Sequence, residues 1–408
     1  INNDKLNDQD IFLVSGIKNI SKIDEIGNKK IIVFDYETHK ILEQKNIIHM
    51  LSDNFLNDSD LLMIDKNSIQ FSKWYDQTFV NDQIFFHNIN LGELLGPKFL
   101  NYIVDFLKKF MELKYIFQSY RNASFHASSS LFPIIKLFTN NVSNIDKSDN
   151  KIFVKENIGL DLSVGRNNYL ELNKGKFVSN IVSFLENILK IFTNKKFVSN
   201  QKTILLFNYT TKRNKKFLLN FPNFEMNFIK FDRNLPSMWN LDSFLTIQKS
   251  NCIIENYSSL INRDSKNQIS ERIFFIEKNI NLIFLNNLFS NFFSIDGISF
   301  WPLIKDQLKI HFQKNLSRII IEIYITKNLF AKYTFSHLLI WNESGINEKI
   351  AIHFAKQNGV KVSCSQHGLL YPTQPDLDNY LGSFPTLSDN FFVWGKINEN
   401  YFKNIQTT

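Results

Sequence analysis

The stretch from Ser336 to Gly368 constrains the fold of this chain more than any other part of the sequence. It reads SHLLIWNESGINEKIAIHFAKQNGVKVSCSQHG, in which an apolar run, a segment with helical spacing of its apolar residues and a second apolar run follow one another. Ser344 stands where a helix N-cap is expected, and Gly359 stands where the chain leaves a helix. This order predicts a β-α-β unit, and the right-handed crossover of such units makes its two strands parallel.

Polar side chains follow each of these two strands. They are Asn342, Glu343 and Ser344 after the first strand, and Gln366, His367 and Gly368 after the second. Ligands of open α/β sheets bind at the carboxyl ends of strands, and neighbouring parallel strands lie ~4.8 Å apart, so we expect both sets to face one cleft. Glu343 can take a proton from an attacking hydroxyl group, and His367 can neutralise a leaving phosphate. We predict these two as catalytic and the other four as substrate or phosphate ligands; a helix-capping glutamate and a structural histidine are the alternatives.

A basic turn follows another predicted strand. The run 202–209, KTILLFNY, has the apolarity of a buried strand, and residues 210–216 after it carry two hydroxyl groups and four cations. A loop of this composition can hold a phosphate or an anionic sugar, which makes Lys212 and Arg213 candidate ligands. A solvated turn in a lysine-rich chain is the alternative.

The chain is predicted to be organised in three stretches. Residues 1–90 form a small α/β layer, residues 91–200 are mainly helical with a linker near 140–150, and residues 201–408 form a Rossmann-like α/β domain. The other predicted strands are 11–15, 30–35, 47–51, 224–231 and 391–394, and the predicted helices are 58–75, 91–117, 177–192 and one opened by Trp301 and Pro302. We also expect Pro97 in the first turn of its helix, a loop at 121–130 and a turn at Asp296 and Gly297.

The charge and composition narrow the classes of partner. A net charge of +8 favours anionic partners such as nucleotides or phospholipid headgroups, but the lysines are spread along the chain, as A/T-rich codon usage also explains. The sequence has neither a zinc-finger spacing nor an RNA-binding aromatic motif, so we expect no nucleic-acid partner, and it shows no metal-ligand cluster. The helix at 91–117 carries lysines beside an apolar stripe, which either packs on a core or lies on a membrane surface.

The two cysteines and the apolar runs bear on the compartment. Cys252 and Cys364 are too few for a disulfide framework, which favours a reducing, cytoplasmic location. No apolar run reaches the ~18–20 residues of a membrane span, and the first residues have no signal-peptide pattern. Any membrane association is therefore expected to be peripheral, at the inner face.

The motifs around the β-α-β unit resemble those of a known family. The run Glu343-Ser344-Gly345, a helix, GVKVSCSQHG at 359–368 and DNFFVWG at 389–395 are similar to surface-polysaccharide glycosyltransferases of the two-Rossmann-domain (GT-B) type. The relatives are the capsule and lipopolysaccharide Kdo-type transferases and the CDP-glycerol glycerophosphotransferases. They carry Gln-His-Gly or Trp-His-Gly at a strand end, and then a strand ending in Trp-Gly. The matching residues here are Gln366, His367 and Gly368, followed by Asp389, Trp394 and Gly395.

The resemblance implies a fold and an activity. The fold would be α/β, with Rossmann-like, open and mainly parallel sheets and helical insertions, as in the N-terminal part of a GT-B enzyme, and the donor-binding domain would follow residue 408. The activity would be transfer of a glycosyl or glycerophosphate unit from a nucleotide-activated donor to a glycan or lipid-linked acceptor, without a further cofactor. A sugar-nucleotide epimerase of similar build and a non-catalytic glycan- or partner-binding module are the alternatives.

Overall fold

The computed structural model describes residues 10–16, 29–145, 197–233, 237–238, 240–261, 263–366 and 387–406. The chain divides into two compact units. Unit 1 comprises residues 1–81, 95–162 and 280–313, and unit 2 comprises residues 82–94, 163–279 and 314–408. The boundaries fall inside helices, because α4 (Leu91–Ser119), α9 (Arg263–Ile283) and α11 (Trp301–Lys332) each contribute to both units.

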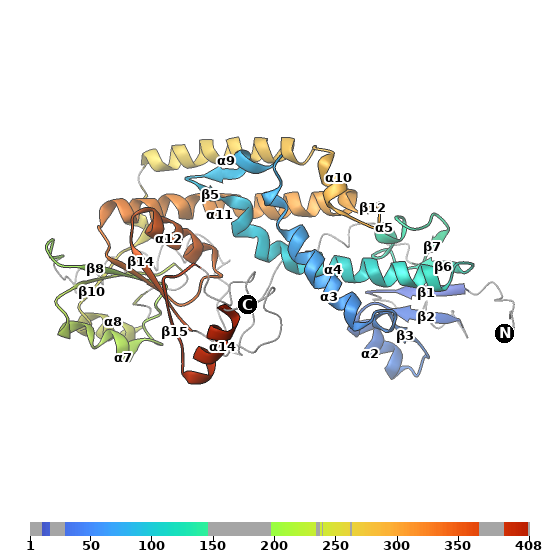
Figure 1. Ribbon diagram of the computed structural model, residues 1–408, viewed down its shortest axis with the longest axis horizontal. Helices are drawn as coiled ribbons and strands as arrows, with labels where there is room; N and C mark the ends of the chain where they lie inside the picture. Colours follow the sequence, from blue (N-terminus) through green and yellow to red (C-terminus); the bar gives the residue numbers. More distant parts are fainter. Residues whose placement is uncertain are drawn as a thin grey trace. The chain divides into compact units, whose positions relative to one another are not determined.

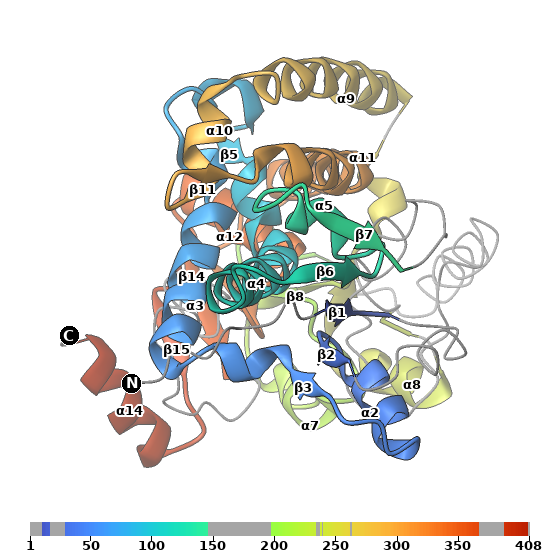
Figure 2. The same ribbon diagram turned by 90° about the vertical axis from the view of Figure 1, so that its right-hand side faces the viewer.

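Unit 1 contains a five-stranded parallel sheet of order β3-β2-β1-β6-β7. Its strands are β1 (Asp10–Val14), β2 (Lys30–Val33), β3 (Met50–Leu51), β6 (Ser124–Ala127) and β7 (Val142–Asn144). The helix α2 (Tyr36–Gln44) covers one face, and α4 lies on the other, as Figures 1 and 2 show. Successive residues of a strand point to opposite faces of the sheet, and each face is covered by a helix. This explains why Ile11, Leu13 and Val14 are all fully buried.

Aromatic side chains build a second core in unit 1. Trp74 and Phe71 pack against buried phenylalanines of the stretch 284–300, with ring centroids 5.4 Å apart for Trp74–Phe284 and 5.3 Å for Phe71–Phe300. The elements of this region are η1 (Ser52–Phe55), α3 (Asp58–Ser72), η2 (Trp74–Asp76), α5 (Phe132–Ile135), α10 (Leu288–Phe292), β11 (Ser294–Ile295), β12 (Ile298–Ser299) and the start of α11. The high phenylalanine content is thus used in packing.

Unit 2 contains a six-stranded parallel sheet of order β10-β9-β8-β13-β14-β15. Its strands are β8 (Thr203–Phe207), β9 (Asn227–Phe231), β10 (Cys252–Ile254), β13 (His337–Ile340), β14 (Lys361–Ser365) and β15 (Asn390–Phe392). In order of appearance along the chain this is 3-2-1-4-5-6, the order of dinucleotide-binding Rossmann sheets. The predicted fold class, an open and mainly parallel Rossmann-like α/β architecture, is confirmed.

Helices cover both faces of the unit 2 sheet. Helices α7 (Lys215–Leu218) and α8 (Leu241–Lys249) lie on one face and α12 (Ile346–Gln357) on the other (Figure 1). Leu218 and Ile247 bury the first two helices in a cluster with Leu206 and Phe228 of the strands. The remaining elements are β4 (Phe85–Phe86), β5 (Ile89–Asn90), η3 (Asn81–Ile84), η5 (Phe221–Asn223), η6 (Tyr257–Ser259) and α14 (Lys396–Gln406).

The predicted β-α-β unit is confirmed, with one difference at its helix start. Strands β13 and β14 pair in parallel, and Gly359 has φ +68° after the C-cap of α12. The N-cap is Gly345 instead of Ser344, because the Asn342 side chain already accepts a hydrogen bond from the Gly345 backbone N–H. Ser344 is left exposed beside it.

Several local predictions were wrong. The expected loop at 121–130 contains β6, and the expected linker near 140–150 begins with β7, because tertiary pairing with β1 and with β6 decides short strands of weak local pattern. The predicted place of Pro97 in the first turn of its helix was also wrong. The Asn90 side chain accepts hydrogen bonds from the first turn of α4, so that helix begins at Leu91 and Pro97 lies inside it.

Two other local predictions, the turn at Asp296 and Gly297 and the helix opened by Trp301, are confirmed. The predicted helix at 177–192 lies outside the described residues.

Candidate functional site

The carboxyl edge of the unit 2 sheet has the geometry of a ligand site. The chain order reverses between β8 and its neighbour β13, so the connections after these two strands run to opposite faces of the sheet. In open α/β sheets this divergence leaves a crevice in which ligands bind. The side chains that follow β8, β9 and β13 are therefore the first to consider.

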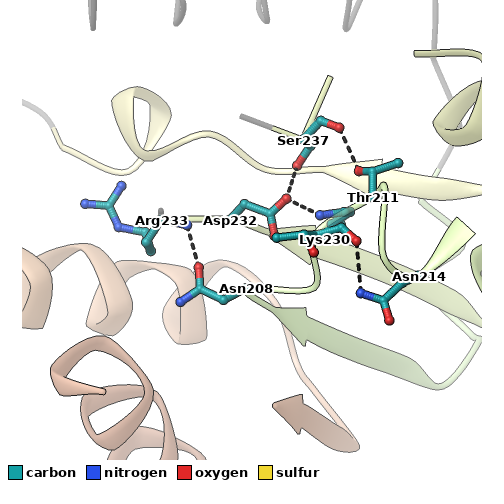
Figure 3. Close-up of polar contacts among 8 residues, drawn as sticks. Asn208, Thr211, Asn214, Lys230, Asp232, Arg233 and Ser237 are labelled. Carbon is teal, nitrogen blue, oxygen red and sulfur yellow. Dashed lines mark hydrogen bonds and ion pairs between the residues drawn. The ribbon is translucent and has the colours of Figure 1, made fainter. Parts of the chain in front are cut away.

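A network of polar contacts fixes the segments after β8 and β9 (Figure 3). Asn208 has φ 57°, and its side-chain oxygen accepts a hydrogen bond from the Arg233 backbone N–H at 2.7 Å. Thr211 donates to the Ser237 carbonyl oxygen at 2.7 Å, and the Ser237 hydroxyl donates to Asp232 at 2.7 Å. These contacts join the two loops into one ordered surface.

A buried ion pair lies in the same network. Lys230, which is fully buried, forms an ion pair with Asp232. Taking both charges out of water is costly, so a pair of this kind persists only where hydrogen bonds support it, as the Ser237 hydroxyl does here. The ion pair between Lys230 in β9 and Asp232 thus holds the segment after β9 in place.

Arg233 turns toward helix α11 and pairs with Glu322. The guanidinium Nε lies 2.8 Å from each carboxylate oxygen, and a terminal nitrogen lies 2.8 Å from Oε2. Glu322 is buried and Arg233 is nearly so. A paired fork of this kind fixes the direction of the arginine and leaves its remaining N–H groups for other acceptors.

A cavity of about 470 Å³ opens beside this ion pair. Its walls are formed by Arg233, Lys314, Ser317, Arg318, Ile321, Glu322 and Asn347. Three of these side chains are cationic and one is anionic, so the cavity keeps an excess of positive charge after Arg233 and Glu322 neutralise one another. In the part of the chain that the structure describes, neither the Lys314 side chain nor the Arg318 side chain forms a hydrogen bond or an ion pair.

Asn347 supplies a second, independent indication of a ligand. The residue is 7% exposed, and its Oδ1 atom has no hydrogen-bond partner among the described residues. It lies in the first turn of α12, where the free backbone N–H groups of a helix favour anions. An unpaired buried amide costs free energy, which a polar ligand in the cavity would recover.

Glu348, the residue after Asn347 in α12, is held by the segment that follows β8. It is buried next to Asn347, and its carboxylate accepts a hydrogen bond from the Asn208 side chain. Burial raises the pKa of Glu348, and the Asn208 hydrogen bond opposes that shift. A Cβ atom at Gly345 would lie 1.9 Å from Glu348 Oε2, so the glycine makes room for this carboxylate.

Glu343, one of the two predicted catalytic residues, lies elsewhere on the same edge. Glu343 is 2% exposed, and its two carboxylate oxygens accept hydrogen bonds from the backbone N–H groups of Leu387 at 2.9 Å and Ser388 at 2.6 Å. These contacts hold the segment that leads into β15. His367 and Gly368 lie outside the described residues, so the predicted pairing of Glu343 with His367 remains a prediction.

The other predicted ligands also make contacts within the protein. Gln366 is buried, and its side-chain oxygen accepts a hydrogen bond from the Trp394 backbone N–H at 2.8 Å. Asn342 accepts from Gly345 and from the exposed Ser344 at the start of α12. Together with Asp389, which accepts from the Val362 backbone N–H at 2.7 Å, the motif residues join β14 to β15.

Lys212 and Arg213 are exposed and do not line the cavity. They stand in the turn after β8, before α7, whereas the cations of the cavity come from the segment after β9 and from α11. Sequence reasoning missed Arg233, Glu322 and Asn347. A weak signal was present in Lys314 and Arg318, two cations four residues apart on one helix face.

The described residues contain no cluster of three or more histidine, cysteine or acidic side chains able to hold a metal ion. Both cysteines are buried and unpaired with one another. Across the described helices, none is long and apolar enough to cross a bilayer. No protein-family model, curated protein or solved structure matches the chain.

Proposed function

We propose that the chain is a transferase that moves a glycosyl or glycerophosphate unit from a nucleotide-activated donor to a glycan or lipid-linked acceptor. The observation that carries the proposal is the basic cavity at the carboxyl edge of a sheet of Rossmann strand order. Its volume of about 470 Å³ is within the range of small-molecule sites, and its charge suits a phosphate-bearing ligand.

Each wall of the cavity has a role in this proposal. Lys314 and Arg318 contact the donor phosphates, and Arg233 completes the cationic wall while Glu322 fixes its direction. Asn347 accepts a hydrogen bond from the sugar or the base. Charge on the leaving phosphate grows as the bond to the transferred unit breaks, so these cations stabilise the transition state more than the bound donor.

The resemblance of the motifs at 343–345, 359–368 and 389–395 supports the same class of reaction. In that proposal His367 contacts the reacting centre, and Glu343 either takes the proton of the acceptor hydroxyl or orients that hydroxyl. Since both oxygens of the Glu343 carboxylate already accept backbone hydrogen bonds, the segment 387–388 has to move before this carboxylate can contact an acceptor hydroxyl.

A direct test is a transfer assay with CMP-, CDP- and UDP-linked donors, run on the full chain. We expect turnover with one of these donors, and a loss on the order of 10-fold or more for Arg318→Gln, since one charge-assisted hydrogen bond contributes about 1.5–3 kcal/mol. If Glu343→Gln and His367→Ala both leave turnover unchanged, their catalytic assignment is wrong.

The engaged carboxylate of Glu343 favours one other function, a module that binds a phosphate-bearing glycan precursor without reacting it. In this case the chain binds the nucleotide-activated donor with the same dependence on Arg318, but no donor is consumed. Product analysis beside a binding measurement distinguishes the two functions.

A further inference from the structure

The outer surface of α7 and α8 in unit 2 combines cations with exposed apolar side chains. The two helices pack side by side on one face of the sheet (Figure 1). Leu218 and Ile247 bury their inner sides, whereas Leu241 is 72% exposed, Phe217 43% and Leu245 41%. Leu241 and Leu245 stand four residues apart and therefore share one side of α8.

The cations of this surface come from the turn between β8 and α7 and from the first residues of α7. Lys212, Arg213 and Lys216 are exposed, and among the described residues none of the three makes a hydrogen bond or ion pair through its side chain. Lys215 forms an ion pair with Asp242 at 2.6 Å, which joins the start of α7 to the start of α8. The cationic turn and the exposed leucines thus belong to adjoining segments.

We propose that this surface, formed by Lys212, Arg213, Lys216, Phe217, Leu241 and Leu245, docks the protein on anionic phospholipid headgroups. Its positive charge complements a negatively charged bilayer, and the three apolar side chains are of the kind that enter the boundary between headgroups and acyl chains. A soluble anion would use the cations but not the exposed leucines, whereas a bilayer uses both.

The local fold makes the turn rigid enough to present these charges together. Asn214 donates to the Thr210 carbonyl oxygen at 2.9 Å, and Thr211 donates to the Ser237 carbonyl oxygen, so both ends of the cationic run are fixed (Figure 3). Docking does not depend on transfer activity, and it places a carboxyl-edge loop of the sheet at the bilayer surface.

The test is sedimentation of the full chain with vesicles of phosphatidylcholine alone and of phosphatidylcholine with phosphatidylglycerol. We expect binding only to the anionic vesicles, weakening as ionic strength rises. The variant Lys212→Gln/Arg213→Gln/Lys216→Gln should lower the partition coefficient on the order of 100-fold at low ionic strength, at about five-fold per charge. Leu241→Ser should lower it about ten-fold.

The matched control is Lys266→Gln/Lys278→Gln/Lys356→Gln, which removes three exposed cations from α9 and α12 of the same unit. We expect this variant to sediment like the unchanged chain, and circular dichroism to show that both triple variants are folded. The proposal is overturned if both triple variants lose binding equally, if the unchanged chain stays in the supernatant, or if the surface instead mediates a dimer that the first variant disrupts.

Discussion

Asp35 in unit 1 and Arg233 in unit 2 occupy corresponding positions, each two residues after the second strand of its sheet. Asp35 accepts hydrogen bonds from the Gly16 and Thr38 backbone N–H groups, both at 2.8 Å, and from the Thr38 hydroxyl. These hydrogen bonds with neighbouring protein groups occupy the Asp35 carboxylate. Arg233 instead pairs with a carboxylate of α11 at the wall of a cavity.

Other polar side chains at the carboxyl edges of the two sheets show the same contrast. In unit 1 the Ser128 hydroxyl accepts from the Ser15 backbone N–H, and the Ser130 hydroxyl donates to the Ser15 carbonyl oxygen. In unit 2, Lys314, Arg318 and the Asn347 side-chain oxygen remain available. Among the described residues, two sheets of similar strand order therefore differ in the polar side chains that remain unpaired at the carboxyl edge, although their fold is alike.

The largest expected effect on stability follows from removing Glu322. Glu322→Gln leaves Arg233 without its carboxylate in a mostly buried position, which we expect to lower the free energy of unfolding by about 3–5 kcal/mol in urea titrations. The control Glu271→Gln, at an exposed position on α9, should change it by less than about 0.5 kcal/mol. Equal effects of the two variants would show that the Arg233–Glu322 ion pair does not stabilise unit 2.

The pH dependence of unit 1 should arise away from its carboxyl edge, on α4. Burial raises the pKa of Glu112 from 4.5 to about 7, while Lys108 opposes the shift. A raised carboxyl pKa stabilises the protonated folded state, so this stability is present below pH ~4.5 and is lost as the pH rises through about 7. Glu112→Gln should therefore raise the free energy of unfolding by about 2–3 kcal/mol at alkaline pH, and flatten its pH profile.

Gly345→Ala should disturb the start of α12 in unit 2. The new methyl group would collide with Glu348 Oε2 and displace a buried, hydrogen-bonded carboxylate, at a cost of about 1–3 kcal/mol in the free energy of unfolding. Gly395→Ala is the matched control, because no atom lies near the position of its Cβ. If both alanine variants unfold at the same denaturant concentration as the unchanged chain, Glu348 is not held by this close approach.

Asp35→Ala should have the smallest effect. It removes the N-cap of α2 and the hydrogen bond to Gly16, for a loss of about 1 kcal/mol in the free energy of unfolding. Binding of nucleotides should stay unchanged, because the Asp35 carboxylate is already engaged by the Gly16 and Thr38 backbone N–H groups and the Thr38 hydroxyl. Asp306→Ala, at an exposed position of α11, serves as the control. A loss of nucleotide binding in Asp35→Ala alone would contradict the contrast between the two edges.

The sequence predicted the parts of the fold that depend on neighbouring residues. The β-α-β unit around α12 is local, and the predicted order of strand, helix and strand is confirmed. Strands β6 and β10 were missed, because strands of only three or four residues carry a weak local pattern and form through pairing with strands elsewhere in the chain. The aromatic core of unit 1 joins residues near 71–74 to residues near 284–301, and no local pattern marks it.

The candidate site could be predicted only in outline. The sequence placed polar side chains at the strand ends, and Glu343 does lie there, but its carboxylate is filled by backbone N–H groups more than forty residues away. Arg233 and Glu322 are 89 residues apart, and the cavity depends on α11 passing over the edge of β9. Contacts between residues so far apart in the sequence depend on tertiary packing, which no local pattern predicts.

The most direct test of the account is calorimetric titration of CMP, CDP and UDP into the chain and two double variants. Lys314→Gln/Arg318→Gln should weaken binding of the preferred nucleotide on the order of 100-fold, since each charge-assisted hydrogen bond contributes about 1.5–3 kcal/mol. Lys305→Gln/Lys309→Gln, which removes two cations at the same spacing from the unit 1 part of α11, should bind like the unchanged chain. Equal affinities of all three proteins, or binding by none, would contradict a phosphate site at the carboxyl edge of unit 2.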